Sequence, residues 1–375
     1  MSKRTVTCAV AVMAAAAFTV SIPSVAQAAD THAGTKALLD RALQNAPGAA
    51  VFAGNAAGSW VLQSGTGDTQ AAKPIQPGEH HRIASQTKTF TAVVTLQLAD
   101  EGKVALDTPI ETSLPGVVDG NGYDGTKITV RQLLQHHSGI PVNNNPRPAR
   151  NPDGSYTLRE VVRDGLSLKP NSAPGTKFEY SNTNFEILGL LIEKVTGRSA
   201  GEAITERIIK PLGLQATGYP RGGDRTLPAP YVHGYAGGRV GPIFFWVDNT
   251  TNVEPSMFGT AGAIESTMSD VTAFYRALAT GKLVSSAGLA EMRKTIPWEG
   301  APAGYDYGLG LVKHTLSCGG DAWGHPGNVV GYATWTAATD DGRYATVVTN
   351  TFSAAAGTNG DDLRFEILDA AICGR

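Results

Sequence analysis

A serine and a lysine three residues apart, Ser85 and Lys88, are the pair in this sequence best suited to do chemistry. Residues three apart share a face of a helix, so the hydroxyl and the amine lie within reach of each other. A serine hydroxyl is a weak nucleophile and needs an adjacent base, and a lysine serves only if desolvation or a nearby cation keeps it partly neutral. The N-terminus of a helix also favours developing negative charge. The pair predicts a nucleophilic serine, although an S-x-x-K match alone arises easily by chance.

Two later motifs carry groups that suit the same reaction. Tyr180-Ser181-Asn182 precedes an apolar pattern at helical spacing, in a loop position where a phenol and an amide can face a cleft. His325-Pro326-Gly327 stands directly before a strand that we expect to begin at Asn328. The plainer interpretations are a buried ring for the tyrosine, a helix cap for the asparagine and a surface loop for the histidine.

In this order, the three motifs resemble those of the penicillin-recognising serine enzymes. The chain is similar to D-alanyl-D-alanine carboxypeptidases, D-aminopeptidases and class C β-lactamases, and most of all to secreted DD-carboxypeptidases. Family-like segments extend through nearly all of the chain after the first 28 residues, at 90–94, 98–103, 133–139, 180–185 and 307–311.

The resemblance implies a role for each site residue. Ser85 attacks the carbonyl, while Lys88 and Tyr180 move its proton to the leaving group. Asn182 orients the substrate amide and Lys88, and His325 sets the electrostatics around Tyr180 and the leaving group.

The same resemblance implies the substrate-binding groups. The N–H groups of Ser85 and Asn328 form an oxyanion hole, with Gly327 in the third motif beside them and Lys313 on the preceding strand. Water resolves the acyl-enzyme, with Tyr180 as its base.

Two departures from the family pattern bear on the substrate. Carboxypeptidases usually carry threonine or serine where this chain has Pro326, and an arginine-rich stretch where it reads Val312-Lys313-His314. The sequence predicts a D-alanyl-D-alanine carboxypeptidase that β-lactams acylate. An esterase, a D-aminopeptidase or D-peptidase, and a class C-like β-lactamase remain open. So does a β-lactam receptor that is acylated without turnover.

Other reaction classes find less support. The chain contains no H-E-x-x-H and no C-x-x-C, so we expect no metal and no cofactor. It also contains no G-x-S-x-G, which argues against the α/β-hydrolase class. His136 and His137 follow a short amphipathic helix, and we expect a structural role for them.

The pattern of elements predicts an α+β fold of the β-lactamase/transpeptidase type. At the beginning we expect a helix over 35–44 and a hairpin of strands 49–53 and 60–64. A buried helix should cover 85–101, because apolar residues surround its circumference. Later helices should begin at Thr129, near Phe185 and at Thr267, and strands should cover 305–312, 328–337 and 343–349, followed by a helix over 363–372.

These elements predict one antiparallel sheet built from both chain ends and flanked by helices, with a helical subdomain inserted. Residues 29–84 and 265–375 should form the α/β part and residues 85–264 the mainly helical part of a single catalytic domain.

The first 28 residues read as an export signal. Lys3 and Arg4 precede an apolar run over 6–20, and Ala26-Gln27-Ala28 has the form of a cleavage site. Serine and proline interrupt the run, which argues against a membrane anchor. We therefore expect a secreted, monomeric chain that begins at Ala29.

Cysteines and charge refine this expectation. Cys318 and Cys373 should pair in an oxidising compartment, with two buried free thiols as the alternative. The formal net charge is -2, and losing the two basic residues of the signal makes it more negative. Nucleic acid and anionic lipid are therefore poor partners, and we expect a D-amino-acid peptide or a peptidoglycan-like substrate.

Overall fold

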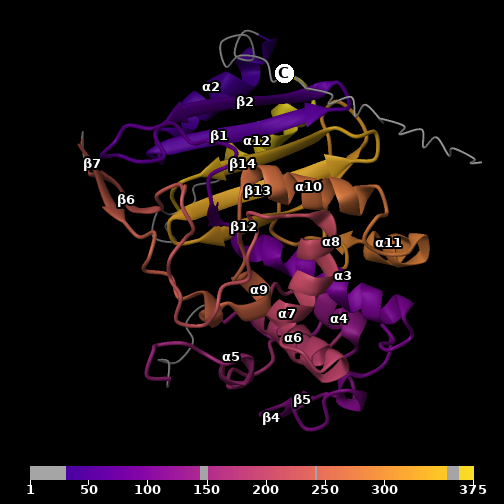
Figure 1. Cartoon of the computed structure of the whole chain (residues 1–375). Coiled ribbons are helices and arrows are strands. Elements are labelled where there is room, and N and C mark those ends of the chain that lie inside the picture. Colours follow the sequence, from indigo (N-terminus) through magenta and orange to yellow (C-terminus); the bar gives the residue numbers. More distant parts are fainter. Residues whose placement is uncertain (1–30, 144–150, 241–242, 353–362) are drawn as a thin grey trace, which may run out of the picture.

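An eight-stranded antiparallel sheet forms the centre of the computed structural model, which describes residues 31–143, 151–240, 243–352 and 363–375 (Figure 1). The strand order is β2-β1-β14-β13-β12-β11-β10-β9. The strands are β1 (Gly48–Asn55), β2 (Gly58–Gly65), β9 (Ile296–Pro297), β10 (Tyr305–Tyr307), β11 (Val312–Thr315), β12 (Asp321–Val329), β13 (Tyr332–Thr339) and β14 (Tyr344–Thr349). β1 pairs with β14, so the two ends of the chain meet in one sheet, as predicted.

Helices cover both faces of this sheet because alternate side chains of each strand point to opposite faces. On one face, α2 (Ala33–Ala42) and α12 (Leu363–Ile372) bury Leu39 and Leu368 against Val347 of β14. On the other face, α10 (Met268–Ala279) places Thr272 in a hydrogen bond with Thr346 of the same strand. Figure 1 shows α10 in front of β13.

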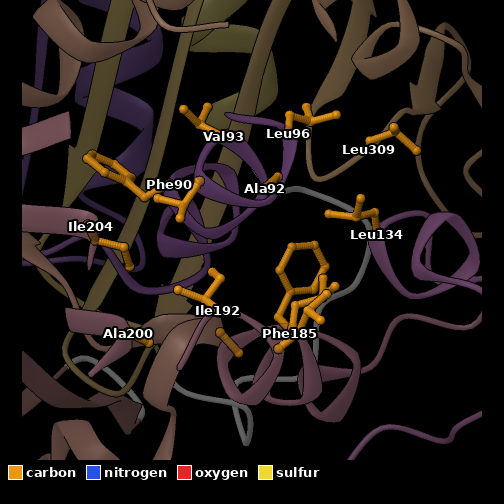
Figure 2. Close-up of a cluster of buried hydrophobic side chains, with 14 of the residues drawn as sticks. Phe90, Ala92, Val93, Leu96, Leu134, Phe185, Ile192, Ala200, Ile204 and Leu309 are labelled. Atoms are coloured by element: carbon orange, nitrogen blue, oxygen red, sulfur yellow. The ribbon is translucent and has the colours of Figure 1, made fainter. Parts of the chain in front are cut away.

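The inserted helical part packs around α3 (Thr87–Asp100), whose side chains are buried almost all round. Phe90 stacks on Phe274 of α10 with ring centroids 3.7 Å apart, and the surrounding apolar side chains include Phe185 and Ile192 (Figure 2). A helix with apolar side chains on every side is stable only inside a core. The other helices of this part are α4 (Val130–Leu134), α5 (Leu158–Leu166), α6 (Asn182–Thr196), α7 (Ala200–Ile204), α8 (Lys210–Leu212) and α9 (Gly259–Gly262). A further helix, α11 (Ser286–Met292), follows α10 in the chain.

Helix ends follow the residues that cap them. Thr129 and Gln132 form a capping box at the start of α4, and Gly197 ends α6 in the left-handed conformation with φ +68°. Thr157 and Glu160 form another box at α5, a helix that was not predicted from the sequence. The hairpin of β6 (Tyr235–Val240) and β7 (Ile243–Asp248) also went unpredicted. Two-residue strands complete the description: β3 (His81–Arg82) with β8 (Glu265–Ser266), and β4 (Asp119–Gly120) with β5 (Tyr123–Asp124).

Two strand predictions were wrong in their bounds, in both cases because a glycine makes a turn. The segment 305–312 is not one strand: β10 ends at Tyr307, and the chain turns at Gly310, with φ +65°, before β11. The segment 328–337 is divided by Gly331, with φ +91°, into the end of β12 and most of β13. His325 and its two successors therefore lie inside β12 and do not open a new strand.

The predicted pairing of Cys318 with Cys373 is confirmed, with Cα atoms 5.7 Å apart. The disulfide joins the turn after β11 to the end of α12. The predicted export signal of residues 1–28 lies outside the described residues. Within the described ranges, no helix combines the length and the apolar character of a membrane span.

Candidate active site

The predicted nucleophile lies in a tight turn directly before the buried helix. Ser85 is the middle residue of the 3₁₀ turn η1 (Ala84–Gln86), and α3 begins at Thr87. Ala84 has φ +47°, a left-handed conformation that costs an alanine about 1–2 kcal/mol. Strain of this kind persists only where the surroundings hold the chain in place. The turn thus fixes the direction in which Ser85 leaves the backbone.

The turn η1 packs closely against β12. A Cβ atom on Gly327 would lie 2.2 Å from the carbonyl oxygen of Ile83, so only glycine allows this approach. On the other side, buried Gln86 donates a hydrogen bond to Thr334 Oγ1 of β13, 2.9 Å away. The sheet therefore positions the nucleophile, and it brings Ser85 next to the strand that carries Asn328.

The ammonium group of Lys88 is fully buried and has three oxygen partners. Lys88 Nζ lies 3.1 Å from Ser85 Oγ, 2.8 Å from Asn182 Oδ1 and 2.9 Å from the carbonyl oxygen of Ala261 in α9. Burial lowers the pKa of Lys88 to about 7, and the nearby carboxyl of Glu186 opposes that fall. A lysine with this pKa is partly neutral near pH 7 and can accept the proton of Ser85.

Tyr180 and Asn182 reach the same place from the start of α6. The ring of Tyr180 lies beside Lys88, with Nζ 4.8 Å from its centroid. Burial raises the pKa of the Tyr180 hydroxyl, and a hydrogen-bonding interaction with Ser85 opposes part of that rise. The structure therefore brings the four predicted residues Ser85, Lys88, Tyr180 and Asn182 together. They come from two segments that are distant in the sequence, since 94 positions separate Lys88 from Asn182.

His325 lies in the same region, but both of its ring nitrogens are engaged. Its Nε2 lies 2.9 Å from the hydroxyl of Tyr307, and its Nδ1 lies 2.6 Å from the carbonyl oxygen of Pro326. A carbonyl only accepts, so Nδ1 carries a proton and Nε2 accepts from Tyr307. Burial, reinforced by the charge of Lys88, lowers the pKa of His325 to about 3. The ring is therefore neutral, and its centroid lies 6.3 Å from that of Tyr180.

The second half of β12 has an open edge. β11 pairs with β12 only as far as Gly324, so among the described residues no strand pairs with 325–329 on that side. Asn328 lies on this part of β12 and is exposed, and the role of its N–H group in an oxyanion hole stays a prediction. Lys313 lies between two carboxylates, 3.6 Å from Asp306 and 3.8 Å from Asp321, and its binding of substrate stays a prediction.

Three further contributors to the site, Glu186, Tyr307 and the backbone of Ala261, were not predicted from the sequence. Glu186 lies one helical turn after Asn182 on α6, and burial raises the pKa of its carboxyl to about 8. Its spacing from Asn182 is a signal that could have identified it. Tyr307 contacts His325, and the carbonyl oxygen of Ala261 accepts a hydrogen bond from Lys88. Both contacts join segments that are distant in the sequence, so no sequence pattern predicts them.

A cavity adjoins the end of β12. It has a volume of 450 Å³ and opens beside Val329 and Val330, and its wall includes the apolar side chains of Met257 and Phe258. The ion pair of Arg225 and Glu254 borders the same cavity. A space of this size is large enough for a small ligand, and the residues that line it are not those around Ser85 and Lys88.

The family model described as Beta-lactamase matches residues 35–369. The chain is similar to penicillin-binding protein 4 of Amycolatopsis lactamdurans, with 28% identity over 72% of this chain and 70% of that protein. It also matches the protein flp of Staphylococcus aureus with 35% identity, over 43% of this chain but only 32% of that longer protein.

Two solved structures are similar over nearly their whole length. A D-stereospecific amidohydrolase from a Streptomyces species has a TM-score of 0.80 and 37% identity, covering 92% of this chain and 99% of that one. The D-amino acid amidase of Ochrobactrum anthropi SV3 has a TM-score of 0.79 and 25% identity, covering 92% and 98%. Both similarities extend across the sheet and the helical part.

Proposed function

Because the chain belongs to the beta-lactamase family of serine hydrolases, we propose that it hydrolyses amide and ester bonds of D-amino-acid substrates through an acyl-Ser85 intermediate. The observation that carries this proposal is the set of contacts around Lys88, whose buried amine lies 3.1 Å from Ser85 Oγ. The 37% identity to a D-stereospecific amidohydrolase supports the choice of D-residues.

The reaction has two steps. In the first, Ser85 Oγ forms a bond to the substrate carbonyl carbon while its proton passes to neutral Lys88. The bond from that carbon to the leaving group breaks as Lys88 passes this proton on, through the Tyr180 hydroxyl, to the departing nitrogen or oxygen, so that both side chains return to their neutral forms. In the second step, water attacks the acyl ester and gives a proton to the same pair, through Tyr180, and the pair returns a proton to Ser85 Oγ as the ester bond breaks. The N–H groups of Ser85 and Asn328 stabilise the oxyanion in both steps.

An amidohydrolase is favoured over a dedicated D-alanyl-D-alanine carboxypeptidase by the groups near the end of β12. Pro326 has no hydroxyl to bind a terminal carboxylate, and the charge of Lys313 is already opposed by Asp306 and Asp321. The carboxypeptidase is the second candidate, supported by the similarity to penicillin-binding protein 4 of Amycolatopsis lactamdurans. We also propose that residues 1–28 direct export of the protein and that the exported protein is a monomer.

A substrate panel distinguishes the candidates. We expect a D-aminoacyl amide to be hydrolysed at least about 100-fold faster than its L-enantiomer, as kcat/KM. A D-alanyl-D-alanine peptide and the same peptide amidated at its C-terminus should both be cleaved. Pro326→Thr should shift preference toward the free acid. A wild-type preference of about a thousandfold or more for the free acid, near 4 kcal/mol, would refute the amidohydrolase and establish the carboxypeptidase.

A β-lactamase, an esterase and a β-lactam receptor would each give a different result in the same assays. Fast turnover of a cephalosporin would indicate the β-lactamase. Cleavage of esters without amides would indicate the esterase. A stable acyl-Ser85 species that forms from every substrate and does not decay would indicate the receptor.

A further inference from the structure

Buried His136 follows α4 and lies behind the catalytic tyrosine. Its side chain is fully buried, and its backbone has φ +57°, which is uncommon for a residue other than glycine. Its ring centroid lies 4.3 Å from that of Tyr180 and 5.0 Å from that of Tyr307. The imidazole therefore contacts Tyr180 directly, and no step of the proposed mechanism uses it.

The hydrogen bonds of His136 determine its protonation. The backbone N–H of Ser181 donates to His136 Nδ1 over 3.1 Å, and a backbone N–H can only donate. Nδ1 must therefore hold a lone pair, so the proton is on Nε2 and the ring is neutral. Burial, reinforced by the charge of Lys88, lowers the pKa of His136 and favours the same state.

A second partner closes the network. Ile140 N–H donates to Ser138 Oγ, and Ser138 O–H donates to Asn184 Oδ1 over 2.6 Å. This leaves the amide nitrogen of Asn184 to donate to His136 Nδ1, 3.1 Å away. Ser181 Oγ donates in turn to the carbonyl oxygen of Pro141. The start of α6 is thus bonded to the segment 136–141 at several points.

These hydrogen bonds fix the backbone on both sides of Tyr180 and directly before Asn182. Glu179 N–H donates to the backbone carbonyl of His136 over 2.7 Å, and Ser181 N–H donates to its ring. Tyr180 lies between those two anchored residues, and Asn182 follows Ser181 as the first residue of α6. A displacement of this segment would move the phenol that protonates the leaving group and the amide that holds Lys88.

We propose that His136 is a positioning residue, whose neutral ring accepts hydrogen bonds from Ser181 and Asn184 and so holds Tyr180 in line with the leaving group. The inference rests on the proposed acyl-enzyme reaction and identifies the side chain that holds the segment Tyr180-Ser181-Asn182 in place.

If His136 acts through Tyr180, its loss should slow only those substrates whose leaving group needs a proton. An amide nitrogen must be protonated to depart, whereas a p-nitrophenyl ester has a leaving group that departs without a proton.

The test compares a D-aminoacyl anilide with the matching p-nitrophenyl ester in variants of position 136. His136→Phe and His136→Ala remove the acceptor, the first with ring volume kept. His136→Asn places Oδ1 where Nδ1 was and tolerates the positive φ. His137→Phe, at a half-buried neighbour outside the network, is the matched control. The fraction of molecules that a β-lactam acylates, measured by intact mass, normalises each rate for correct folding.

In a folded variant without the acceptor, we expect kcat/KM, which reports acylation and not the later attack of water, to fall by about 100-fold for the anilide and to stay within about threefold of wild type for the ester. His136→Asn should restore the anilide-to-ester ratio to within about tenfold, and His137→Phe should leave it unchanged. If neither Phe nor Ala folds, the ratio in His136→Asn decides the question. An unchanged ratio without the acceptor, or a hundredfold loss in Asn, would overturn the proposal. Absence of any Ser85 acylation in wild type would instead refute the proposed function.

Discussion

Lys88 owes its chemistry to its surroundings more than to its spacing from Ser85. The sequence predicted that Ser85 and Lys88 share a face, because helix geometry fixes which residues are neighbours. It did not predict Glu186 or the carbonyl of Ala261, which face the same amine from other elements. Burial depends on the whole fold, so the fall in the pKa of Lys88 to about 7 becomes visible only in the structure.

Replacing Lys88 by alanine should lower kcat/KM by a factor of about 100 to 10,000, because Ser85 then lacks its base. In wild type the reactive form of Lys88 is neutral, and this form increases as the pH rises through its pKa. Activity should therefore rise with pH through a limb near pH 7. The kcat/KM of Lys88→Ala on an ester checks the first statement, and the pH profile of wild-type kcat/KM on the same ester checks the second. A limb near the ordinary lysine pKa, or activity falling over this range, would contradict the buried base.

At the scale of elements, glycines explain where the predictions failed and why the site is compact. Strand composition correctly identified the segments around 305, 328 and 343, but periodicity did not show the turns at Gly310 and Gly331. The residues 325–327 consequently lie within β12, where Gly327 meets the turn η1. Such close approaches between segments distant in sequence leave no periodic pattern.

Gly327→Ala should reduce both activity and stability. The added Cβ would meet the carbonyl oxygen of Ile83 at 2.2 Å, and neither backbone can yield without moving η1 away from β12. Overpacking of this kind costs about 1–3 kcal/mol in the free energy of unfolding. Displacement of Ser85 by about 1 Å should lower kcat/KM by about 100-fold. Urea unfolding and ester kinetics measure the two effects.

Gly78→Ala is the matched control, because a Cβ at Gly78 meets no atom within 4 Å. It should leave the ester kinetics unchanged. Wild-type kinetics in Gly327→Ala would show that the contact of η1 with β12 does not position the nucleophile.

At the scale of the whole molecule, the two chain ends form the sheet and the middle forms the helical part that faces it. The order of elements predicted this α+β architecture, since early and late strand patterns enclose a helical region. Helix α5 and the hairpin of β6 and β7 were missed. In α5 the capping signal of Thr157 and Glu160 is present in the sequence, so that helix was predictable.

Replacing both cysteines of the Cys318–Cys373 pair by serine should destabilise the protein without changing its chemistry. The disulfide encloses a sequence separation of 55 residues and lies between the turn after β11 and the end of α12. Its loss should lower the free energy of unfolding by about 2–5 kcal/mol. We expect kcat on an ester to stay within about twofold of wild type. Denaturant unfolding and kinetics at a temperature below both transitions check this, and a loss of kcat in the fully folded variant would contradict it.

Covalent labelling of Ser85 tests the central claim most directly. The nucleophile, the buried amine of Lys88 and the open edge of β12 should together react with the strained carbonyl of a β-lactam. Wild-type protein, quenched in acid after mixing with a penicillin, should gain the mass of one inhibitor, and peptide mapping should locate it on Ser85. Ser85→Ala, folded to the same stability, should gain none. Labelling at another residue, or an unchanged mass for folded wild type, would contradict the account.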